Sequence, residues 1–398
     1  MKFTIERNIL LAALQRISNA VMTYKRANAL GAYLYRNFIF HADLDELTIE
    51  ASDREVVMIE TVSIGNPDAE KKIFAIEAGP LLKAVKSLDG QSLEFEILEY
   101  QVIVKHTTGR FALPLDERVL EYDAMRKAEV NHDTAHYLKL EAPGIKSILE
   151  RCAYAVAQDE LRPVMNGVCL NLTNDYADFA ASDGHKLIRI RKTSIKTDSP
   201  AIMVIPKIVV SILRKITPNT GFVEIWFNDY KFDWPQDDLD NRPPCACRIV
   251  VENTVIIFVP VQGRYPAYNS VIPEDHFTRF VTVSRQALIK SIDRLSLFGN
   301  ESTGLITINL TAGRMYMSSE DKDFSTSADE EIPCSFDGQE PIRIGFKDHS
   351  LLQTLRNLNT TEVTFKIQDQ TRAIIINPAI QPESEEITAL LMPMLIND

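Results

Sequence analysis

The stretch KFTIERNILLAALQRISNAV (residues 2–21) determines how the rest of the chain is interpreted. Its opening residues have the character of a short strand. The residues that follow place apolar side chains at the spacing of one helix face, at Leu10, Leu14, Ile17 and Val21. The stretch therefore predicts a strand that leads directly into an amphipathic helix.

This strand–helix pattern occurs three times. It returns as LKLEAPGIKSILERCAYAV (residues 138–156) and as VTVSRQALIKSIDRLSLF (residues 281–298). The strand ends at Glu6, Glu141 and Ser284, which are 135 and 143 residues apart. A spacing this regular indicates an internal repeat, and each repeat is long enough to be a domain.

A second strand–helix pattern alternates with the first, at residues 73–88, 202–216 and 342–358. Strands with period-two alternation follow each copy, which is typical of half-buried antiparallel sheet. The predicted fold class is α+β: three repeated domains, each with two helices packed on antiparallel sheets. The six predicted helices cover residues 7–22, 80–88, 143–156, 206–216, 284–298 and 347–358. The predicted domains cover residues 1–126, 134–264 and 275–398, the second with an inserted loop at 229–247.

Composition excludes several classes of protein. The chain has 398 residues, of which 45% are hydrophobic and 25% charged, as in an ordinary globular protein and unlike a disordered or collagen-like chain. Its five cysteines are scattered and odd in number, which favours a reducing compartment over a disulfide framework. No window approaches about 18 uninterrupted apolar residues, so we expect no membrane span.

Charge is unevenly distributed along the chain. The formal charge is −12, yet the six predicted helices carry 14 basic and 3 acidic residues. The predicted helices therefore carry a net formal charge of +11, and the remainder of the chain carries −23. A shared basic surface of this kind suits a polyanion held by its phosphates. The basic residues lie along helix faces without an aromatic-studded loop, which favours contact with the nucleic-acid backbone over readout of bases.

Four motifs resemble those of one family, the bacterial DNA polymerase III beta subunit, or sliding clamp. The opening strand and helix are similar to the start of that family. The segments DELRPVMNGVCL (residues 159–170) and ASDGHKLIRI (residues 181–190) resemble its central signatures. The segment VQGRYPAYNSVIP (residues 261–273) resembles its second interdomain linker, and LLMPML (residues 390–395) its C-terminus.

The resemblance implies a head-to-tail homodimer, closed into a ring that encircles double-stranded DNA without regard to sequence. The family has no catalytic residues, no metal and no cofactor, and it tethers the polymerase to DNA. Implied partners are the DNA polymerase III alpha subunit, clamp loader subunits, and other polymerases and repair proteins that bind through short linear peptides. The implied location is cytoplasmic and nucleoid-associated.

The resemblance also implies two sets of site residues. A hydrophobic groove for partner peptides is expected at Met165, Ser182, Gly184, His185, Lys186, Leu187, Pro266, Val271, Leu390, Met392, Pro393 and Met394. Methionine suits such a groove because its flexible thioether adapts to varied ligands. The DNA-facing residues are expected to be Arg7, Lys25, Arg26, Lys83, Lys86, Lys146, Arg151, Lys207, Arg214, Lys215, Lys290, Arg294 and Lys347, with Lys25 and Arg26 in a loop after the first helix.

Other interpretations are weaker. Ser182, Asp183 and His185 are hydrolase residue types, but residues crowded into one short loop do not readily form a catalytic triad. His132, Asp133 and His136 lie in the first interdomain linker without a further ligand nearby, so they are expected to be solvated linker residues rather than a metal site. The serious alternative is a repeat-built protein–protein scaffold that never encircles DNA and binds an acidic partner with its basic helices.

Overall fold

The computed structural model describes residues 1–65, 71–122, 130–228, 246–273, 277–338 and 340–396. It divides into two compact units, Met1–Ile145 with Lys215–Pro260, and Lys146–Arg214 with Val261–Asp398. We call these unit 1 and unit 2 and describe each by itself. The predicted insertion at 229–247 lies outside the described residues except for Ala246 and Cys247, which are buried at the start of a strand.

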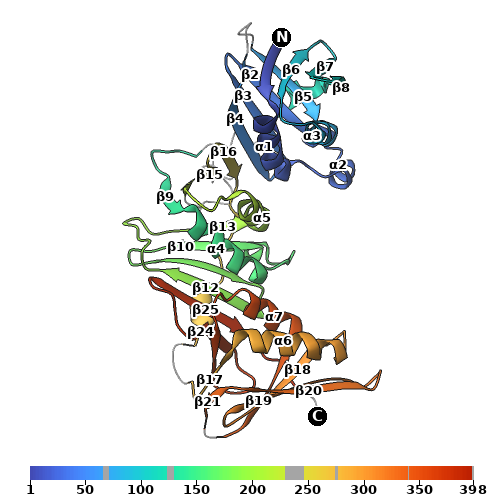
Figure 1. Cartoon of the computed structure of the whole chain (residues 1–398). Coiled ribbons are helices and arrows are strands. Elements are labelled where there is room, and N and C mark those ends of the chain that lie inside the picture. The colour runs from blue at the N-terminus through green and yellow to red at the C-terminus, as the bar shows by residue number, and fades with distance from the viewer. Residues whose placement is uncertain (66–70, 123–129, 229–245, 274–276, 339, 397–398) are drawn as a thin grey trace. The chain divides into compact units, whose positions relative to one another are not determined.

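All six predicted helices are present, each directly after a strand (Figure 1). They are α1 (Arg7–Ile17), α3 (Ala78–Ser87), α4 (Ala142–Cys152), α5 (Lys207–Ile216), α6 (Arg285–Leu295) and α7 (Asp348–Arg356). Single 3₁₀ turns continue α1, α4 and α6, at Ser18–Ala20, Ala153–Ala155 and Ser296–Phe298. Buried side chains at Leu10, Leu14 and Ile17 confirm the apolar face predicted for α1.

One prediction was wrong, because Tyr24–Leu30 forms a further helix, α2, where a loop was expected. The Thr23 hydroxyl caps its start by accepting a hydrogen bond from the Arg26 N–H, and Gly31 ends it with φ +62°. With seven residues and one buried side chain, Ala27, the helix is too short for its apolar period to show in the sequence.

Unit 1 contains two antiparallel sheets. The four-stranded sheet has the order β1 (Lys2–Glu6), β6 (Ser92–Ile97), β7 (Gln101–His106), β8 (Gly109–Pro114). The eight-stranded sheet has the order β5 (Lys72–Glu77), β2 (Asn37–Asp43), β3 (Glu46–Ser52), β4 (Val56–Ser63), β16 (Thr254–Phe258), β15 (Cys247–Val251), β14 (Phe222–Phe227), β9 (His136–Glu141). Aromatic rings fill the core of the first repeat: Phe3 stacks on Phe95 and Phe40 stacks on Phe74, at 4.9 and 5.0 Å between centroids.

Unit 2 also contains two antiparallel sheets. The nine-stranded sheet has the order β13 (Ala201–Pro206), β10 (Gly167–Leu172), β11 (Ala177–Ser182), β12 (Lys186–Lys192), β25 (Glu385–Leu391), β24 (Ile374–Pro378), β23 (Glu362–Ile367), β17 (Arg279–Ser284), β21 (Ser335–Asp337). The four-stranded sheet has the order β20 (Thr326–Pro333), β19 (Arg314–Asp321), β18 (Leu305–Thr311), β22 (Ile342–Lys347).

Apart from the edge strand β21, these sheets are built from two kinds of four-stranded half-sheet. Each repeat has one half-sheet that contains its opening strand, which we call type A: β1-β6-β7-β8, β9-β14-β15-β16 and β17-β23-β24-β25. Each repeat also has a type B half-sheet: β5-β2-β3-β4, β13-β10-β11-β12 and β22-β18-β19-β20. Pairing of β4 with β16, and of β12 with β25, joins a type B half-sheet to the type A half-sheet of the next repeat. The two half-sheets of the central repeat therefore lie in different units.

In the first and third repeats, an arginine at the start of one helix ties the two helices of the repeat together. Arg7 opens α1 and donates hydrogen bonds to the carbonyls of Val85 and Lys86, at 3.0 and 2.8 Å, where α3 ends. Arg285 opens α6 and donates to the carbonyls of Leu355 and Thr360, at 3.2 and 2.6 Å, where α7 ends. A cation at these positions satisfies carbonyls that the helix leaves unpaired and complements its dipole.

Candidate functional site

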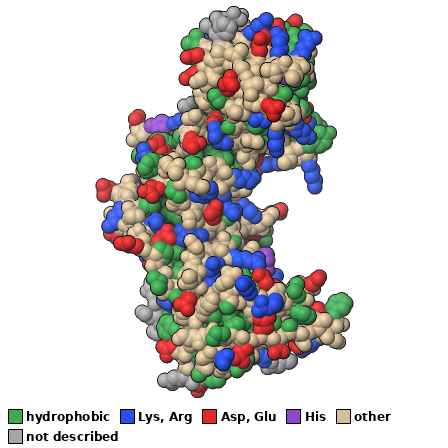
Figure 2. All heavy atoms as spheres, in the orientation of Figure 1, with side chains coloured by type: hydrophobic (Ala, Val, Ile, Leu, Met, Phe, Trp, Pro, Cys, Tyr) green, Lys and Arg blue, Asp and Glu red, His purple; other side chains and the backbone are tan. Residues whose placement is uncertain are grey.

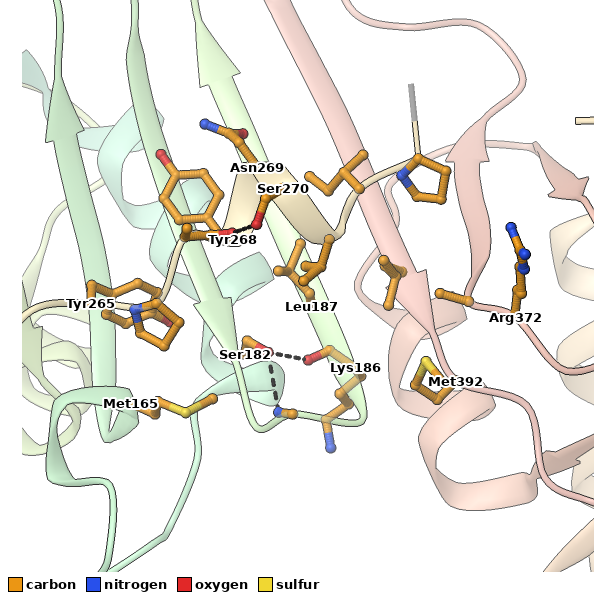
Figure 3. Close-up of a pocket in the computed structure, with 18 of the residues that line it drawn as sticks. Met165, Ser182, Lys186, Leu187, Tyr265, Tyr268, Asn269, Ser270, Arg372 and Met392 are labelled. Atoms are coloured by element: carbon orange, nitrogen blue, oxygen red, sulfur yellow. Dashed lines mark hydrogen bonds between the residues drawn. The ribbon is translucent and has the colours of Figure 1, made fainter. Parts of the chain in front are cut away.

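Unit 2 contains a pocket of about 990 Å³ in which most of the predicted groove residues meet (Figure 3). Nine of the twelve line it: Met165, Ser182, Gly184, Lys186, Leu187, Pro266, Val271, Leu390 and Met392. They come from β11, β12 and β25, from the 3₁₀ turn Pro163–Met165 and from the linker after residue 260. Segments more than 200 residues apart in sequence are thus brought to one place.

The turn between β11 and β12 forms one side of the pocket, and its sequence explains its shape. The Asp183 carboxylate accepts hydrogen bonds from the backbone N–H groups of His185 and Lys186, both at 2.9 Å. The Ser182 hydroxyl donates to the Lys186 carbonyl at 2.9 Å, and Gly184 provides φ +92°. Ser182 and Asp183 are therefore used to build the turn.

Charge at this turn is locally balanced. The Lys186 ammonium lies 2.9 Å from the Asp183 carboxylate and is only 12% exposed. Burial acts to raise the pKa of Asp183, but the hydrogen bonds from Lys186 and the two backbone N–H groups outweigh it and hold that pKa below its ordinary value. The carboxylate is thus ionised at neutral pH, and the Lys186 stem is left to cover the apolar floor.

The floor of the pocket is apolar and well packed. Leu187 of β12 lies directly opposite Leu390 of β25, and both are at least 95% buried. Tyr265 and Tyr268 of the linker pack in the same cluster. Met392, at 39% exposed, and Val271, at 56%, form the open rim. A concave apolar surface with a flexible methionine at its mouth is suited to bind apolar side chains of a short peptide.

The remaining three predicted groove residues lie beside the pocket and do not line it. The His185 carbonyl accepts a hydrogen bond from the Met392 N–H at 2.8 Å, so it ties the C-terminal tail to the β11–β12 turn. Met394 donates its N–H to the Gly345 carbonyl at 2.8 Å, which attaches the tail to β22. Pro393 lies between these two attachments. These residues therefore set the course of the tail.

The sequence interpretation missed more than half of the pocket lining. The missed residues are Arg162, Tyr265, Ala267, Tyr268, Asn269, Ser270, Ile272, Pro273, Gln368, Thr371, Arg372 and Ala373. The linker residues could have been predicted from the sequence, because their motif was identified. Only Pro266 and Val271 of that motif were assigned to the groove. The residues at 368–373 form the turn between β23 and β24, for which no sequence signal exists.

Polar side chains behind the linker hold it in place. The Tyr268 hydroxyl donates to the Asp178 carboxylate at 2.9 Å and accepts from the Asn171 amide at 2.9 Å. Asp178 is fully buried and also accepts two hydrogen bonds from Arg191, at 2.8 and 2.9 Å. In Figure 3 the hydroxyl of Tyr268 and the amide of Asn269 point away from Met165, Lys186 and Met392. The linker is therefore anchored on the side opposite the pocket.

The predicted DNA-facing residues differ in exposure. Nine are exposed, and we call them the exposed basic set: Lys25, Lys83, Lys86, Lys207, Arg214, Lys215, Lys290, Arg294 and Lys347. Within unit 1, Figure 2 shows Lys and Arg side chains over the region of α2; within unit 2, it shows them over α6 and α7. Three members of the set have polar contacts. Lys207 contacts Gln158 and Lys215 contacts Asn19, both at 3.2 Å, and Arg294 makes an ion pair with Glu330 at 2.5 Å.

The other four are partly or largely occupied. Arg7 is half-buried against the end of α3, Arg26 pairs with Asp53 and Glu55, and Lys146 is half-buried. Arg151 is 9% exposed and makes a two-pronged ion pair with Glu385, at 2.8 and 3.0 Å. A buried guanidinium whose donors are already paired cannot reach a phosphate without breaking that pair.

The side chains that could bind a metal ion are dispersed in the described residues. These residues contain no group of three or more His, Cys, Asp or Glu side chains arranged to hold a metal ion. His132 and His136 instead lie near Trp226 and Phe227, at 6.0 and 5.0 Å between ring centroids. Among the described residues, no helix is both long enough and apolar enough to cross a membrane.

Comparison with known proteins agrees with this organisation. Three family models match: the N-terminal, central and C-terminal domains of the DNA polymerase III beta subunit, at residues 1–125, 139–266 and 269–395. The chain is 24% identical to the beta sliding clamp of Pseudomonas putida over 99% of this chain and all of that one. It is 22% identical to the beta sliding clamp of Treponema pallidum, over 99% of each.

Solved structures have the same fold. The DNA polymerase sliding clamp of Pseudomonas aeruginosa, crystallised with a ligand, superposes with a TM-score of 0.86 at 21% identity, over the whole of both chains. The sliding clamp of Bacillus subtilis superposes with a TM-score of 0.85 at 20% identity, again over both whole chains. Because the three domain models match in order along nearly the entire chain, this protein belongs to the DNA polymerase III beta subunit family.

Proposed function

We propose that this chain, a DNA sliding clamp and non-catalytic processivity factor, closes its ring by pairing β20 of one copy with β8 of a second copy. The observation that carries the proposal is the sheet arrangement. Two of the three type B half-sheets are joined to a type A half-sheet, through β4–β16 and β12–β25. Among the described strands, the outer edges of β8 and β20 have no partner.

The two existing junctions support a particular choice of strands for the third. In both existing junctions the last strand of a type B half-sheet pairs antiparallel with the last strand of a type A half-sheet. The strands in the same positions of the open half-sheets are β20 and β8. A head-to-tail dimer would join them twice, so neither β8 nor β20 would keep an open edge. Unpaired edges otherwise invite uncontrolled association.

The surfaces near the two edges suit such a contact. Leu297 and Phe324 are 79% and 80% exposed, and Phe298 is 43% exposed. They lie close to β20, because the Phe298 carbonyl accepts a hydrogen bond from Thr326, the first residue of that strand, at 3.0 Å. β20 carries Asp329, Glu330 and Glu331, whereas β8 carries Arg110. Exposed apolar residues beside complementary charge favour an interface.

Sedimentation velocity tests the dimer. We expect a species of twice 45.0 kDa at micromolar concentration, and Leu297→Asp should convert it to a monomer. Ile380→Asp is the matched control, since Ile380 is 84% exposed and lies away from β8 and β20 in sequence and in sheet order. A wild-type chain that sediments only at 45.0 kDa would contradict the proposed junction.

For DNA, we propose contact through the exposed basic set except Arg294, which is paired with Glu330 on β20. Arg151 is left out because it is buried. Contacts to phosphates alone leave each register on DNA nearly equal in energy, so the ring can slide. Rings loaded on closed circular DNA should remain bound and should leave when the circle is cut. Equal retention on cut and closed DNA would favour the alternative, a scaffold that does not encircle DNA.

For partners, we propose that the pocket in unit 2 is a groove for short apolar peptides of the polymerase III alpha subunit, clamp loader subunits and other polymerases or repair proteins. Its apolar floor and exposed Met392 support this assignment. Deleting residues 392–398 should abolish binding of the polymerase without changing the dimer, whereas deleting residues 395–398 should weaken it less. Unchanged affinity after the longer deletion would remove the assignment.

We further propose domain limits of 1–126, 134–264 and 275–398, and a cytoplasmic, nucleoid-associated location. Limited proteolysis tests the limits, because the first cuts should fall between these ranges rather than within them. The location follows from the proposed work on DNA, and fluorescence of a tagged chain would test it.

A further inference from the structure

A second pocket, of about 440 Å³, lies in unit 2 beside the groove. Three linker residues, Asn269, Ile272 and Pro273, line both pockets. The linker segment 269–273 therefore forms a wall shared by the two. The rest of the second pocket comes from strands β12, β23, β24 and β25 and from nearby loops. These residues are Tyr176, Arg189, Arg191, Phe277, Lys366, Ile375, Asn377, Glu386 and Thr388.

The chemistry of this second pocket differs from that of the groove. Its lining includes three cations, Arg189, Arg191 and Lys366, and one carboxylate, Glu386. Arg191 is neutralised from behind by the fully buried Asp178, and Arg189 by Glu386 at 2.5 Å. Lys366 has no carboxylate partner among the described residues, and its ammonium lies 6.0 Å from the centroid of the Phe277 ring. One positive charge is thus left uncompensated.

Arg189 adds an unused donor. It is 8% exposed, and its Nη atoms donate to Asn269, Glu386 and Thr388. Its Nε–H is buried without an acceptor. A buried donor left without a partner is unfavourable, because it has lost its hydrogen bond to water. Because its partner Glu386 has a side chain that is 49% exposed, that carboxylate can exchange with another oxyanion at little cost.

We propose that this second pocket binds a carboxylate side chain of the same partner segment whose apolar residues occupy the groove. The proposal rests on the proposed peptide-binding function. A single uncompensated charge matches one carboxylate better than a phosphate dianion. A segment that lies in the groove would reach the second pocket by crossing over the linker at 269–273, which separates the two. Partners of this chain would then carry an aspartate or glutamate next to their apolar residues.

The test begins with overlapping 15-residue peptides that cover the polymerase III alpha subunit of the same organism, measured against the full-length wild-type chain. The tightest binder is then extended with Glu-Glu or Gln-Gln, at one end and at the other. We expect Glu-Glu to tighten binding three- to tenfold over Gln-Gln at one end only. If no peptide binds at all, the proposed groove function fails. If a peptide binds and Glu-Glu brings no gain at either end, only the present proposal is overturned.

Substitutions in the protein test whether Lys366 causes the tighter binding of the Glu-Glu peptide. Lys366→Gln should abolish the difference between Glu-Glu and Gln-Gln without weakening the unextended peptide. Lys196→Gln, an exposed lysine of unit 2 in neither pocket, removes the same charge and should leave the difference intact. Lys366→Glu should invert the preference, so that a Lys-Lys extension binds more tightly than Glu-Glu. A difference that survives Lys366→Gln, or is lost equally in Lys196→Gln, would overturn the proposal.

Discussion

The junction between the first and second repeats, in unit 1, and the junction between the second and third, in unit 2, use the same ion pair in different surroundings. The tenth residue of α1, α4 and α6 is an arginine in each case: Arg16, Arg151 and Arg294. Each pairs with a glutamate on a strand at the junction side of a half-sheet: Glu60 on β4, Glu385 on β25 and Glu330 on β20. Only the first two glutamates lie on strands that have joined another half-sheet.

Burial of the pair follows from that difference. The Glu60 side chain is fully buried, and Thr254 of the joined strand β16 donates to it as well. Glu385 is 10% exposed and has a second cation, Lys192 of β12, at 3.1 Å. Arg294 and Glu330 are 58% and 25% exposed, at an edge without a partner strand. The comparison shows that the arginine attaches a helix to its sheet. It also indicates that the contribution of the ion pair to folding stability depends on whether a neighbouring half-sheet covers it.

The largest effect is expected at the first junction. Arg16→Met removes the guanidinium and leaves Glu60 buried without its cation, which should cost about 3–5 kcal/mol of unfolding free energy. Denaturant unfolding measures the loss, and hydrogen exchange should show it concentrated in α1 and β4. Arg16→Met combined with Glu60→Met should recover much of the stability. A single variant within about 1 kcal/mol of wild type would show that Glu60 is satisfied without Arg16.

These pairs also show why the sequence predicted the helices but misjudged part of their surface. The apolar periods of α1, α4 and α6 are local, and the predicted positions are confirmed. The partners of Arg16, Arg151 and Arg294 lie 44, 234 and 36 residues away in the sequence. No local pattern connects them, so arginines that fasten helices to sheets were counted with lysines that face solvent.

The groove was predicted unevenly for a related reason. Its motif-bearing segments were found because the turn Ser182–Lys186 and the tail at 390–394 have recognisable sequences, and nine of the twelve predicted residues do line the pocket. Gln368 and Arg372 lie on a β23–β24 turn whose place beside the groove depends on the pairing of β12 with β25. That pairing joins residues about 200 positions apart, and the sequence of neither segment alone predicts it.

A smaller effect is expected at the second junction. Arg151→Met should cost about 2 kcal/mol, because Glu385 keeps a hydrogen bond and an ion pair with Lys192. The double variant Arg151→Met with Lys192→Met should approach the loss predicted for Arg16→Met, since it removes both cations. Denaturant unfolding of the three variants provides the measurement. If Arg151→Met alone lowers the unfolding free energy as much as Arg16→Met does, then Lys192 does not compensate for the lost cation. The two junctions would then depend on their arginines equally.

Acid should weaken the second junction in a defined direction. Burial acts to raise the pKa of Glu385, but Arg151 and Lys192 outweigh it and lower that pKa below its ordinary value of 4.5. A carboxyl with a lowered folded pKa stabilises the fold above the unfolded value, and that contribution disappears as pH falls through the folded pKa. The unfolding free energies of wild type and Glu385→Gln should therefore differ at pH 7 and converge below pH 4.5. A difference that stays constant to pH 3 would contradict this assignment.

The smallest effect on folding is expected at the open edge. Arg294→Met should change the unfolding free energy by at most about 1 kcal/mol, because both charges remain solvated. The effect on the dimer should be larger, since a β8 strand paired with β20 would cover Glu330 much as β16 covers Glu60. Sedimentation at decreasing concentration measures the dimer, and Arg356→Met is the matched control, because its pair with Asp293 is similarly exposed but lies off β20. If Arg294→Met weakens dimer and fold equally little, the edge is not buried on assembly, and the third junction does not repeat the first two.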